Sequence, residues 1–292
     1  MGLFDFIFRK NKEQDSNNNT NLLEKIEIAP GLSILRAFLP YSESILKTKL
    51  SYISIQATPG DDLTLEQSKF GHYPFMPAGF EYPKDAQGMY MYPLAQINCR
   101  EVPVFDGFPE SGYLQFYISA DHELYGLDFN NQQLQDDFRV LYFTEEEVKN
   151  YKADFSFLDD VIQSHMVPVN KPHALSFSLK EQYLGVEDFH NEELNSRIIE
   201  MTRQYPEIEI ELRRAFYDTF SSNGHKIGGY AYFTQAEPRD YESPFKDYIL
   251  LLQMDSDNEI MWGDVGVANF FIHPDDLRKK DFSKVMYNWD CG

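Results

Sequence analysis

Three carboxylates near the C-terminus are the residues of this sequence best suited to acid–base chemistry. Asp255 and Asp257 lie in the run DSDNE, and Asp264 follows in the run WGDVG. Two carboxylates held close together in a cleft can serve as general acid and general base. A hydrolase-like enzyme would use these three residues as catalytic candidates, with Gln253 and Asn269 as donors that orient the substrate.

The run DSDNE also suggests a calcium-binding loop. An EF-hand loop requires Gly at its sixth position and a carboxylate at its twelfth. Those positions hold Ile260 and Gly266, so the pattern fails. We interpret the run as a tight turn between two strands, in which Asp, Ser and Asn side chains favour turn conformations.

Two glutamines in apolar, strand-like segments are candidates for ligand binding. A long amide such as Gln96 or Gln253 is costly to bury unless it is hydrogen-bonded. In the functional interpretation both line a cleft together with Trp262, Asp264 and Asn269. In the structural interpretation each amide satisfies backbone groups, and WGDVG is a turn that the fold requires. We favour the structural interpretation and keep the five residues as the candidate ligand-binding set.

Other catalytic and metal-binding signatures are missing from the sequence. The seven histidines form no HxH, HxxxH or HExxH motif, and there is no GxSxG elbow, P-loop or GxGxxG fingerprint. The two cysteines, Cys99 and Cys291, lack CxxC spacing, and Cys99 is expected to be a small buried residue. We therefore predict no cofactor and no metal. Free thiols fit a reducing compartment, so we expect a cytoplasmic location.

The elements that must position these residues are mainly short strands. Residues 21–28 and 31–50 carry helical spacing interrupted by proline and glycine. SYISIQA at 51–57 alternates like a strand, and aromatic-rich strands separated by Gly/Pro turns follow over 69–143. A high content of Phe and Tyr favours such pleated, half-buried surfaces.

The middle of the chain, 144–224, changes to helical character. Thr144 and Glu147 have the spacing of a capping box. The segments NEELNSRIIEMTRQ and EIELRRAFYDTF each keep apolar residues on one helical face. Strand-like segments resume at Lys226, and HPDDL predicts one further helix that begins at Pro274.

The two strand-rich parts of the sequence resemble each other. The matching blocks, in the same order, are KFGHYPF with KIGGYAY, PLAQIN with LLLQMD, GYLQFYI with GVANFFI, and RVLY with KVMY. Gln96 thereby corresponds to Gln253, and Lys69 to Lys226, two lysines that we expect to be solvated. We interpret the blocks as a duplicated β unit. A cleft between the copies is then the natural place for a ligand.

These observations predict an α+β, mainly β fold of internally duplicated, mostly antiparallel β units, with helices between the copies and at the N-terminus. The predicted organisation is a flexible tail and linker at 1–20 and a single domain at 21–292. Within the domain we expect the first β unit at about 51–143, the helical insert at about 144–224 and the second β unit at about 225–292.

The composition restricts the class of partner. The chain of 292 residues is 42% hydrophobic, which is ample for a packed core, and its net charge is -21. Binding to nucleic acid needs a Lys/Arg footprint, and none of useful size is visible, so nucleic acid is excluded. An acidic surface is compatible with a basic protein partner.

The N-terminal run MGLFDFIFRKNK places Leu3, Phe4 and Ile7 on one helical face. Docking of residues 1–12 on a membrane surface is one interpretation of this pattern. We favour a frayed tail, because a single short amphipathic turn binds weakly and the low-complexity linker NKEQDSNNNT follows it.

Several segments together resemble the YwqG-like family of bacterial cytoplasmic proteins. They are SKFGHYPFMPAGFEYP, YPLAQIN, GYLQFYI, KIGGYAYFTQAEPRD, LLLQMDSDN and MWGDVGVANFFI with DFSKVMYNWDCG. The resemblance runs from about residue 25 to the C-terminus and implies a mainly β, internally duplicated architecture. It implies no reaction, because the family is a domain of unknown function. His72, where the family has a second glycine, and Tyr82-Pro83, in place of Trp-Pro, depart from the pattern.

The leading hypothesis is a cytoplasmic binding protein without catalytic activity that holds a protein partner or a small ligand between its two β units. A specific version is an acidic, immunity-like protein that neutralises a basic partner, in keeping with the charge of -21. The alternative is a hydrolase-like enzyme that uses carboxylates in the cleft.

Overall fold

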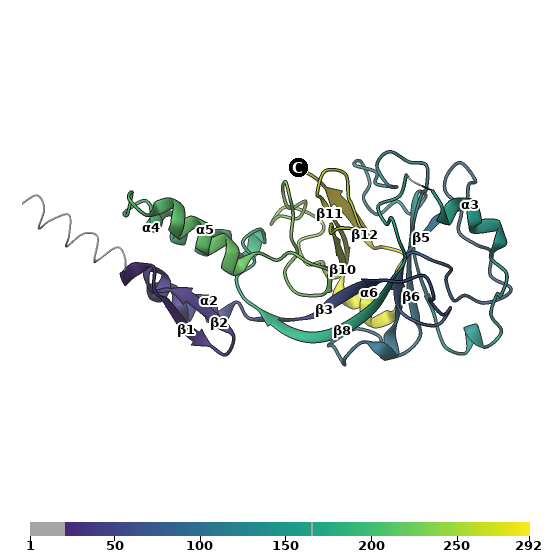
Figure 1. Cartoon of the computed structure of the whole chain (residues 1–292), viewed down its shortest axis with the longest axis horizontal. Coiled ribbons are helices and arrows are strands. Elements are labelled where there is room, and N and C mark those ends of the chain that lie inside the picture. Colours follow the sequence, from purple (N-terminus) through teal and green to yellow (C-terminus); the bar gives the residue numbers. More distant parts are fainter. Residues whose placement is uncertain (1–20, 165) are drawn as a thin grey trace, which may run out of the picture. The chain divides into compact units, whose positions relative to one another are not determined.

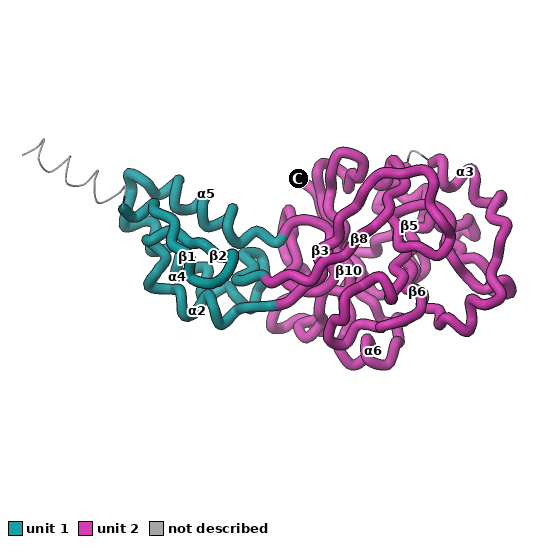
Figure 2. The backbone as a smooth tube through the Cα atoms, turned by 60° about the horizontal axis from the view of Figure 1, so that its bottom comes forward, with its two compact units in different colours: residues 1–50, 182–222 teal, residues 51–181, 223–292 magenta. Residues whose placement is uncertain are grey.

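The computed structural model describes residues 21–164 and 166–292, which form two compact units. Unit 1 contains the described residues up to Leu50 together with Gln182–Ser222, and unit 2 contains Ser51–Glu181 and Asn223–Gly292 (Figure 2). The predicted insert at 144–224 is thus divided between the two units. The amphipathic segment at 1–12 lies outside the described residues.

Unit 1 joins a β-hairpin to short helices. Its elements are β1 (Lys25–Ala29), β2 (Leu32–Leu35), a 3-10 helix (Arg36–Tyr41), α2 (Ser42–Lys47), a 3-10 helix (Phe189–Asn191), α4 (Glu192–Thr202) and α5 (Glu209–Phe220) (Figure 1). The helical spacing predicted over 21–28 and 31–50 is therefore wrong for residues 25–28 and 32–35, which are strands in the structure. Half-buried Ile26 and Ile28 alternate with exposed neighbours, and Gly31, with φ +77°, turns the chain into β2. The core of this unit contains Phe38, Leu212 and other apolar side chains.

Unit 2 contains most of a ten-stranded, mainly antiparallel sheet. The strands are β3 (Leu50–Pro59), β4 (Lys69–Phe70), β5 (Tyr92–Asn98), β6 (Tyr113–Ile118), β7 (Phe138–Phe143), β8 (His173–Gln182), β9 (Lys226–Ile227), β10 (Ile249–Asp255), β11 (Val267–Ile272) and β12 (Met286–Asp290). Their order across the sheet is β12-β11-β10-β9-β3-β8-β4-β5-β6-β7. The expected α+β, mainly β class is confirmed.

Short helices connect the strands of unit 2. They are 3-10 helices at Cys99–Glu101, Glu147–Lys149 and Ser156–Leu158, with α3 (Asp159–Ile162) and α6 (Pro274–Lys279). The capping box at Thr144 is confirmed, because its backbone N–H donates to Glu147 Oε2 at 2.8 Å and its Oγ1 accepts from Glu147 N at 3.3 Å. Pro274 is the first residue of α6, as predicted. No helix in the described ranges is long and apolar enough to span a membrane.

The strands β4–β7 and β9–β12 repeat the same local structure on either side of β3 and β8. Both sets run in sequence order toward opposite ends of the sheet. The β5–β6 pairing shifts register between Pro93 and Ala95, and the β10–β11 pairing shifts between Leu250 and Leu252. These positions match in the repeat alignment. The interpretation of the two sets as a duplicated unit stays a prediction.

The space between the two sets of strands is filled by the largest hydrophobic core. Phe116 of β6 contacts Phe270 of β11 with ring centroids 4.9 Å apart, and both side chains are wholly buried. Phe138 of β7 and Tyr287 of β12 lie 5.1 Å apart in the same core. Aromatic side chains from opposite ends of the sheet therefore meet in its interior.

Candidate functional site

Two of the catalytic candidates, Asp255 and Asp257, use their carboxylates to accept hydrogen bonds from backbone N–H groups. Asp255 accepts hydrogen bonds from Gly224 N at 2.6 Å and from Ser256 N at 2.8 Å. Asp257 Oδ1 accepts from the backbone of Glu259 and Ile260, which confirms a turn at DSDNE. Burial raises the pKa of Asp257, but these bonds outweigh it and lower the pKa overall.

Asp257 also lies beside His225, whose side chain is 9% exposed. Its Oδ2 is 3.3 Å from His225 Nε2, and His225 Nδ1 accepts from Asp255 N. Burial lowers the pKa of His225, and the neighbouring carboxylate opposes that effect. Among the described residues no set of three His, Cys, Asp or Glu side chains converges as a metal site would require.

The third candidate, Asp264, lies exposed in a strained turn. Gly266 N donates to Trp262 O at 2.7 Å, and both Gly263 and Val265 have positive φ. In the part of the chain that the structure describes, no hydrogen bond or ion pair engages the Asp264 carboxylate. Its backbone oxygen accepts from Gly292 N at 3.1 Å.

The predicted glutamine pair forms equivalent hydrogen bonds to backbone. Gln96 Oε1 accepts from Phe75 N at 2.6 Å, and Gln253 Oε1 accepts from Tyr232 N at 2.8 Å. The Nε2 groups donate to Gln67 O and to Gly224 O, respectively. Both side chains are buried, so each amide satisfies loop backbone that would otherwise be unpaired.

Two further members of the predicted ligand set, Trp262 and Asn269, are also buried. Asn269 Nδ2 donates to Tyr232 O at 2.9 Å, while its Oδ1 has no partner among the described residues. Trp262 packs against Tyr125 and Trp289 with ring centroids 5.4 and 6.2 Å away. Neither residue lines either of the two hollows described below, and the ligand role of the set stays a prediction.

Two lysines at matching positions are buried, and their expected solvation is wrong. Lys69 is 0% exposed and Lys226 is 2% exposed. Lys69 Nζ donates to Thr64 O at 2.6 Å and to Leu65 O at 2.9 Å. Burial lowers the pKa of Lys69 to about 7, although Glu66 and Glu101 act in the opposite direction. Sequence spacing could not reveal this, because the accepting carbonyls belong to loops.

The two ends of the sheet meet at a seam. β7 is the last strand at one end and β12 at the other. The segment before β7 bridges them, because Gln132 O accepts from Tyr287 N at 2.9 Å and Gln132 Nε2 donates to Asn288 Oδ1 at 2.8 Å. Gln135 continues the seam, with Nε2 donating to Phe282 O and Oε1 accepting from Val140 N.

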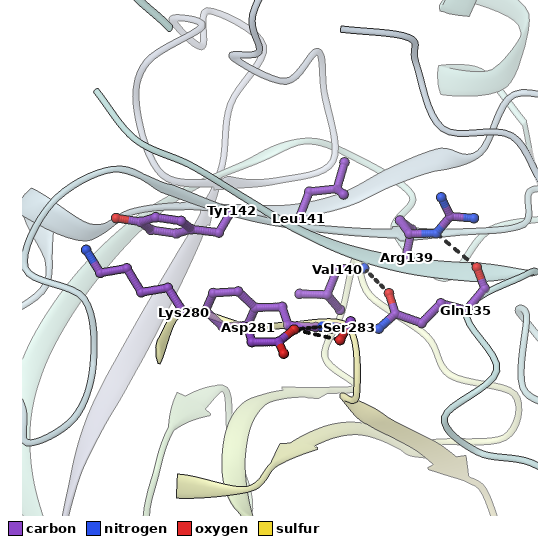
Figure 3. Close-up of a pocket in the computed structure, with 9 residues that line it drawn as sticks. Gln135, Arg139, Val140, Leu141, Tyr142, Lys280, Asp281 and Ser283 are labelled. Atoms are coloured by element: carbon purple, nitrogen blue, oxygen red, sulfur yellow. Dashed lines mark hydrogen bonds between the residues drawn. The ribbon is translucent and has the colours of Figure 1, made fainter. Parts of the chain in front are cut away.

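A hollow of about 330 Å³ opens along this seam. We call it the seam hollow. Its lining residues come from β7 with Gln135 and from the link between α6 and β12, and they are Gln135, Arg139, Val140, Leu141, Tyr142, Lys280, Asp281, Phe282 and Ser283 (Figure 3). Lys280 and Tyr142 lie at one end, and Arg139 and Gln135 lie at the other.

The two cations of the seam hollow retain unused donors. Arg139 Nε donates to Gln135 O at 2.9 Å, and its terminal nitrogens have no partner among residues 21–164 and 166–292. Lys280 Nζ lies 5.1 Å from the centre of the Tyr142 ring and, within the same described ranges, donates to no oxygen. The one carboxylate, Asp281, accepts from Ser283 N and Oγ, which lower its pKa.

A second hollow, of about 550 Å³, lies within unit 1 between the hairpin and α5. Its charged residues are two cations, Lys25 and Arg214, and two acids, Glu211 and Asp218. This balance favours no sign of ligand charge, whereas the seam hollow has two cations against one acid.

One known protein family matches most of the chain. The family described as Domain of unknown function (DUF1963) matches residues 68–291. The chain belongs to the DUF1963 family. The matched region of this DUF1963 protein includes both ends of the sheet and every residue of the seam hollow, whereas the hairpin β1–β2 precedes it. No curated protein matches the chain.

Sequence reasoning missed the residues of the seam hollow. A usable signal was the run RKKDFSK at 278–284, a dense cluster of cations in an otherwise acidic chain. Arg139 gave no signal, because an arginine in an alternating strand is ordinarily a solvated residue. Arg139 and the run at 278–284 come together only because the two ends of the sheet meet.

Proposed function

We propose that this DUF1963 protein is a non-catalytic binding protein whose ligand occupies the seam hollow. The observation that carries the proposal is the position of the hollow, where the last strand of one half and the link into the last strand of the other contribute the lining. Its volume of about 330 Å³ is at the lower end of the range for small-molecule sites. We also propose that the protein is YwqG-like and that it is located in the cytoplasm.

Hydrogen–deuterium exchange in the presence of a small-molecule extract of the source cells tests this proposal. A ligand of the seam hollow is expected to slow exchange in residues 139–142 and 280–283. Ser283→Trp, which fills the hollow from an exposed position, should abolish that protection. Ser156→Trp, at an exposed serine outside the hollow, should retain it. The proposal would be refuted if the protection survives in Ser283→Trp, or if no fraction of the extract slows exchange in these residues.

A basic protein partner is a second candidate, favoured by the net charge of -21. Electrostatic association accelerates encounter and weakens with salt. Capture of a basic protein at low salt that is lost at moderate salt and in charge-reduced variants would support an immunity-like role. Capture that is indifferent to salt would count against it.

The hydrolase-like alternative has less support. Asp255 binds the backbone N–H of Gly224, Asp257 binds that of Glu259, and Asp264 lies in a separate turn. None of the three lines either hollow. Enzymatic activity that persists in Asp257→Asn and disappears in Asp264→Asn would revive the alternative.

A further inference from the structure

The seam hollow combines an apolar floor with positive charge. Val140 and Phe282 are buried members of the unit 2 core, and both line the hollow. Arg139 and Lys280 flank this floor from two different segments of the chain (Figure 3). A molecule seated there would contact carbon in the middle and cations at its ends.

Positive charge here runs against the character of the whole chain. The protein carries 47 acidic and 26 basic residues, so a random surface hollow should be acidic. Lys279 and Lys284 flank the hollow and are close enough to lower the pKa of Asp281. The lining of the hollow thus carries two cations, Arg139 and Lys280, against one acid, Asp281, in a chain that is acidic as a whole.

The donors of the hollow remain available to a ligand. Arg139 is fixed through its Nε bond to Gln135 O, which leaves the terminal nitrogens for a planar, bidentate contact with a carboxylate or phosphate. Tyr142 Oη is already used, donating to Ser111 O at 2.7 Å. The hydrogen-bonding potential of the side chains here is thus dominated by cations.

The conformation of Lys280 is a further sign of function. Lys280 caps α6 with φ +57° and ψ +33°, a left-handed position where helices ordinarily use glycine. A residue other than glycine is strained in this conformation, and residues whose conformation opposes stability are concentrated at functional sites. Here the strained backbone directs an ammonium group to the rim of a hollow.

We infer that the seam hollow binds a small organic anion, with a carboxylate or phosphate at Arg139 and Lys280 and an apolar body against Val140 and Phe282. This inference rests on the proposed function and adds the chemical class of the ligand. The hollow is too small for a folded partner, and its charge disfavours a cationic ligand.

Paired probes that differ only in charge test the inference. Phenyl phosphate and benzoate should bind and slow exchange in residues 139–142 and 280–283, whereas neutral benzamide should not. Raising the salt concentration should weaken the binding. Arg139→Gln should reduce the affinity by about tenfold or more, since a hydrogen bond to a charged group is lost. Arg139→Lys keeps the charge but lacks the planar fork of the guanidinium group, so its affinity should lie between those of the parent and of Arg139→Gln.

Lys280→Gly separates binding from folding. Glycine relieves the left-handed conformation, so this variant is expected to be at least as stable as the parent while losing about tenfold in affinity. Lys180→Gln removes the same charge from an exposed lysine of β8, in the middle of the strand order and outside the lining, and should retain the affinity. Equal losses in both variants would show a diffuse charge effect and overturn the inference.

The two proposals fail in different ways. If neither phenyl phosphate nor benzoate slows exchange at the seam hollow, the inference that the ligand is an anion is overturned. If an extract component that carries no anionic group protects the seam hollow, the proposed binding function stands and the anion inference falls. If neither probes nor extract protect residues 139–142 and 280–283, both proposals fail.

Discussion

At the scale of single residues, the buried amides and lysines show how unit 2 satisfies its irregular backbone. Gln253 is wholly buried and bonds one N–H and one carbonyl of neighbouring loops, at Tyr232 and Gly224. Lys69 donates to two carbonyls of the loop before its own strand. These groups have the chemistry of a binding site, but the partners they contact belong to the protein itself.

Replacement of Gln253 by leucine should therefore destabilise the fold. The N–H of half-buried Tyr232 and the carbonyl of Gly224 lose a buried partner, and an unpaired group that stays away from water costs about 1–3 kcal/mol. Urea denaturation of Gln253→Leu is expected to give a free energy of unfolding lower by about 2–4 kcal/mol. Gln56→Leu, at an exposed glutamine, is the control and should change stability by less than about 0.5 kcal/mol. A stable Gln253→Leu protein with impaired ligand binding would instead favour a ligand role.

The buried Lys69 should make stability depend on alkaline pH. Its pKa is lowered from 10.5 to about 7 in the folded state, so above pH 7 the unfolded chain binds more protons than the native one. Stability from this group therefore rises between pH 7 and about 10.5. Urea midpoints at pH 7 and pH 9 should differ more for the parent than for Lys69→Met. An equal difference in both proteins would contradict a lowered pKa.

At the scale of elements, the WGDVG turn is defined by close backbone approach. A Cβ at Gly266 would lie 2.0 Å from Asp290 O and 2.6 Å from Trp262 O. The Ser256 hydroxyl adds a second link, donating to Gly266 O and accepting from Trp262 N. These contacts account for the glycine and the serine, and they leave the Asp264 side chain without a structural task.

Substitutions at neighbouring positions of this turn should act with opposite signs. Gly266→Ala should cost about 3 kcal/mol or more, because the clash is with backbone. Val265→Gly should stabilise by about 1 kcal/mol, since an exposed valine there holds φ at +54°. Thermal unfolding measures both. Asp264→Ala is the matched control, with a change within about 0.5 kcal/mol. If Gly266→Ala is tolerated, the turn is not required by the fold.

At the scale of the whole molecule, charge and core act in opposite directions. A net charge of -21 makes the native state repel itself, and salt screens that repulsion. The separate apolar cores of unit 1 and unit 2 supply the opposing hydrophobic stabilisation.

Sodium chloride should therefore raise the urea midpoint at pH 7 between about 20 and 300 mM, a range over which the screening length shortens several-fold. At pH 5, close to the pI of about 4.6, the same change in salt should have a much smaller effect. A midpoint that falls with salt at pH 7 would indicate that attractive ion pairs, rather than net repulsion, dominate.

The sequence by itself determined the class of fold, the helices α4, α5 and α6, and the capping box at Thr144. The helices and the capping box depend on contacts a few residues apart, which periodicity and spacing record directly. The hairpin β1–β2 was missed because segments of only five and four residues fit both the helical and the strand period, and pairing across the turn at Gly31 decided between them.

Only the tertiary structure decided where a ligand could bind. The repeat in the sequence directed attention to Gln96, Gln253 and Asn269, whose partners turned out to be backbone groups of adjacent loops. Arg139 and Lys280 are far apart in sequence, and closure of the sheet brings them to one hollow. Polar groups that a strand must satisfy and polar groups offered to a ligand are the same residue types. Only the positions of their partners tell them apart.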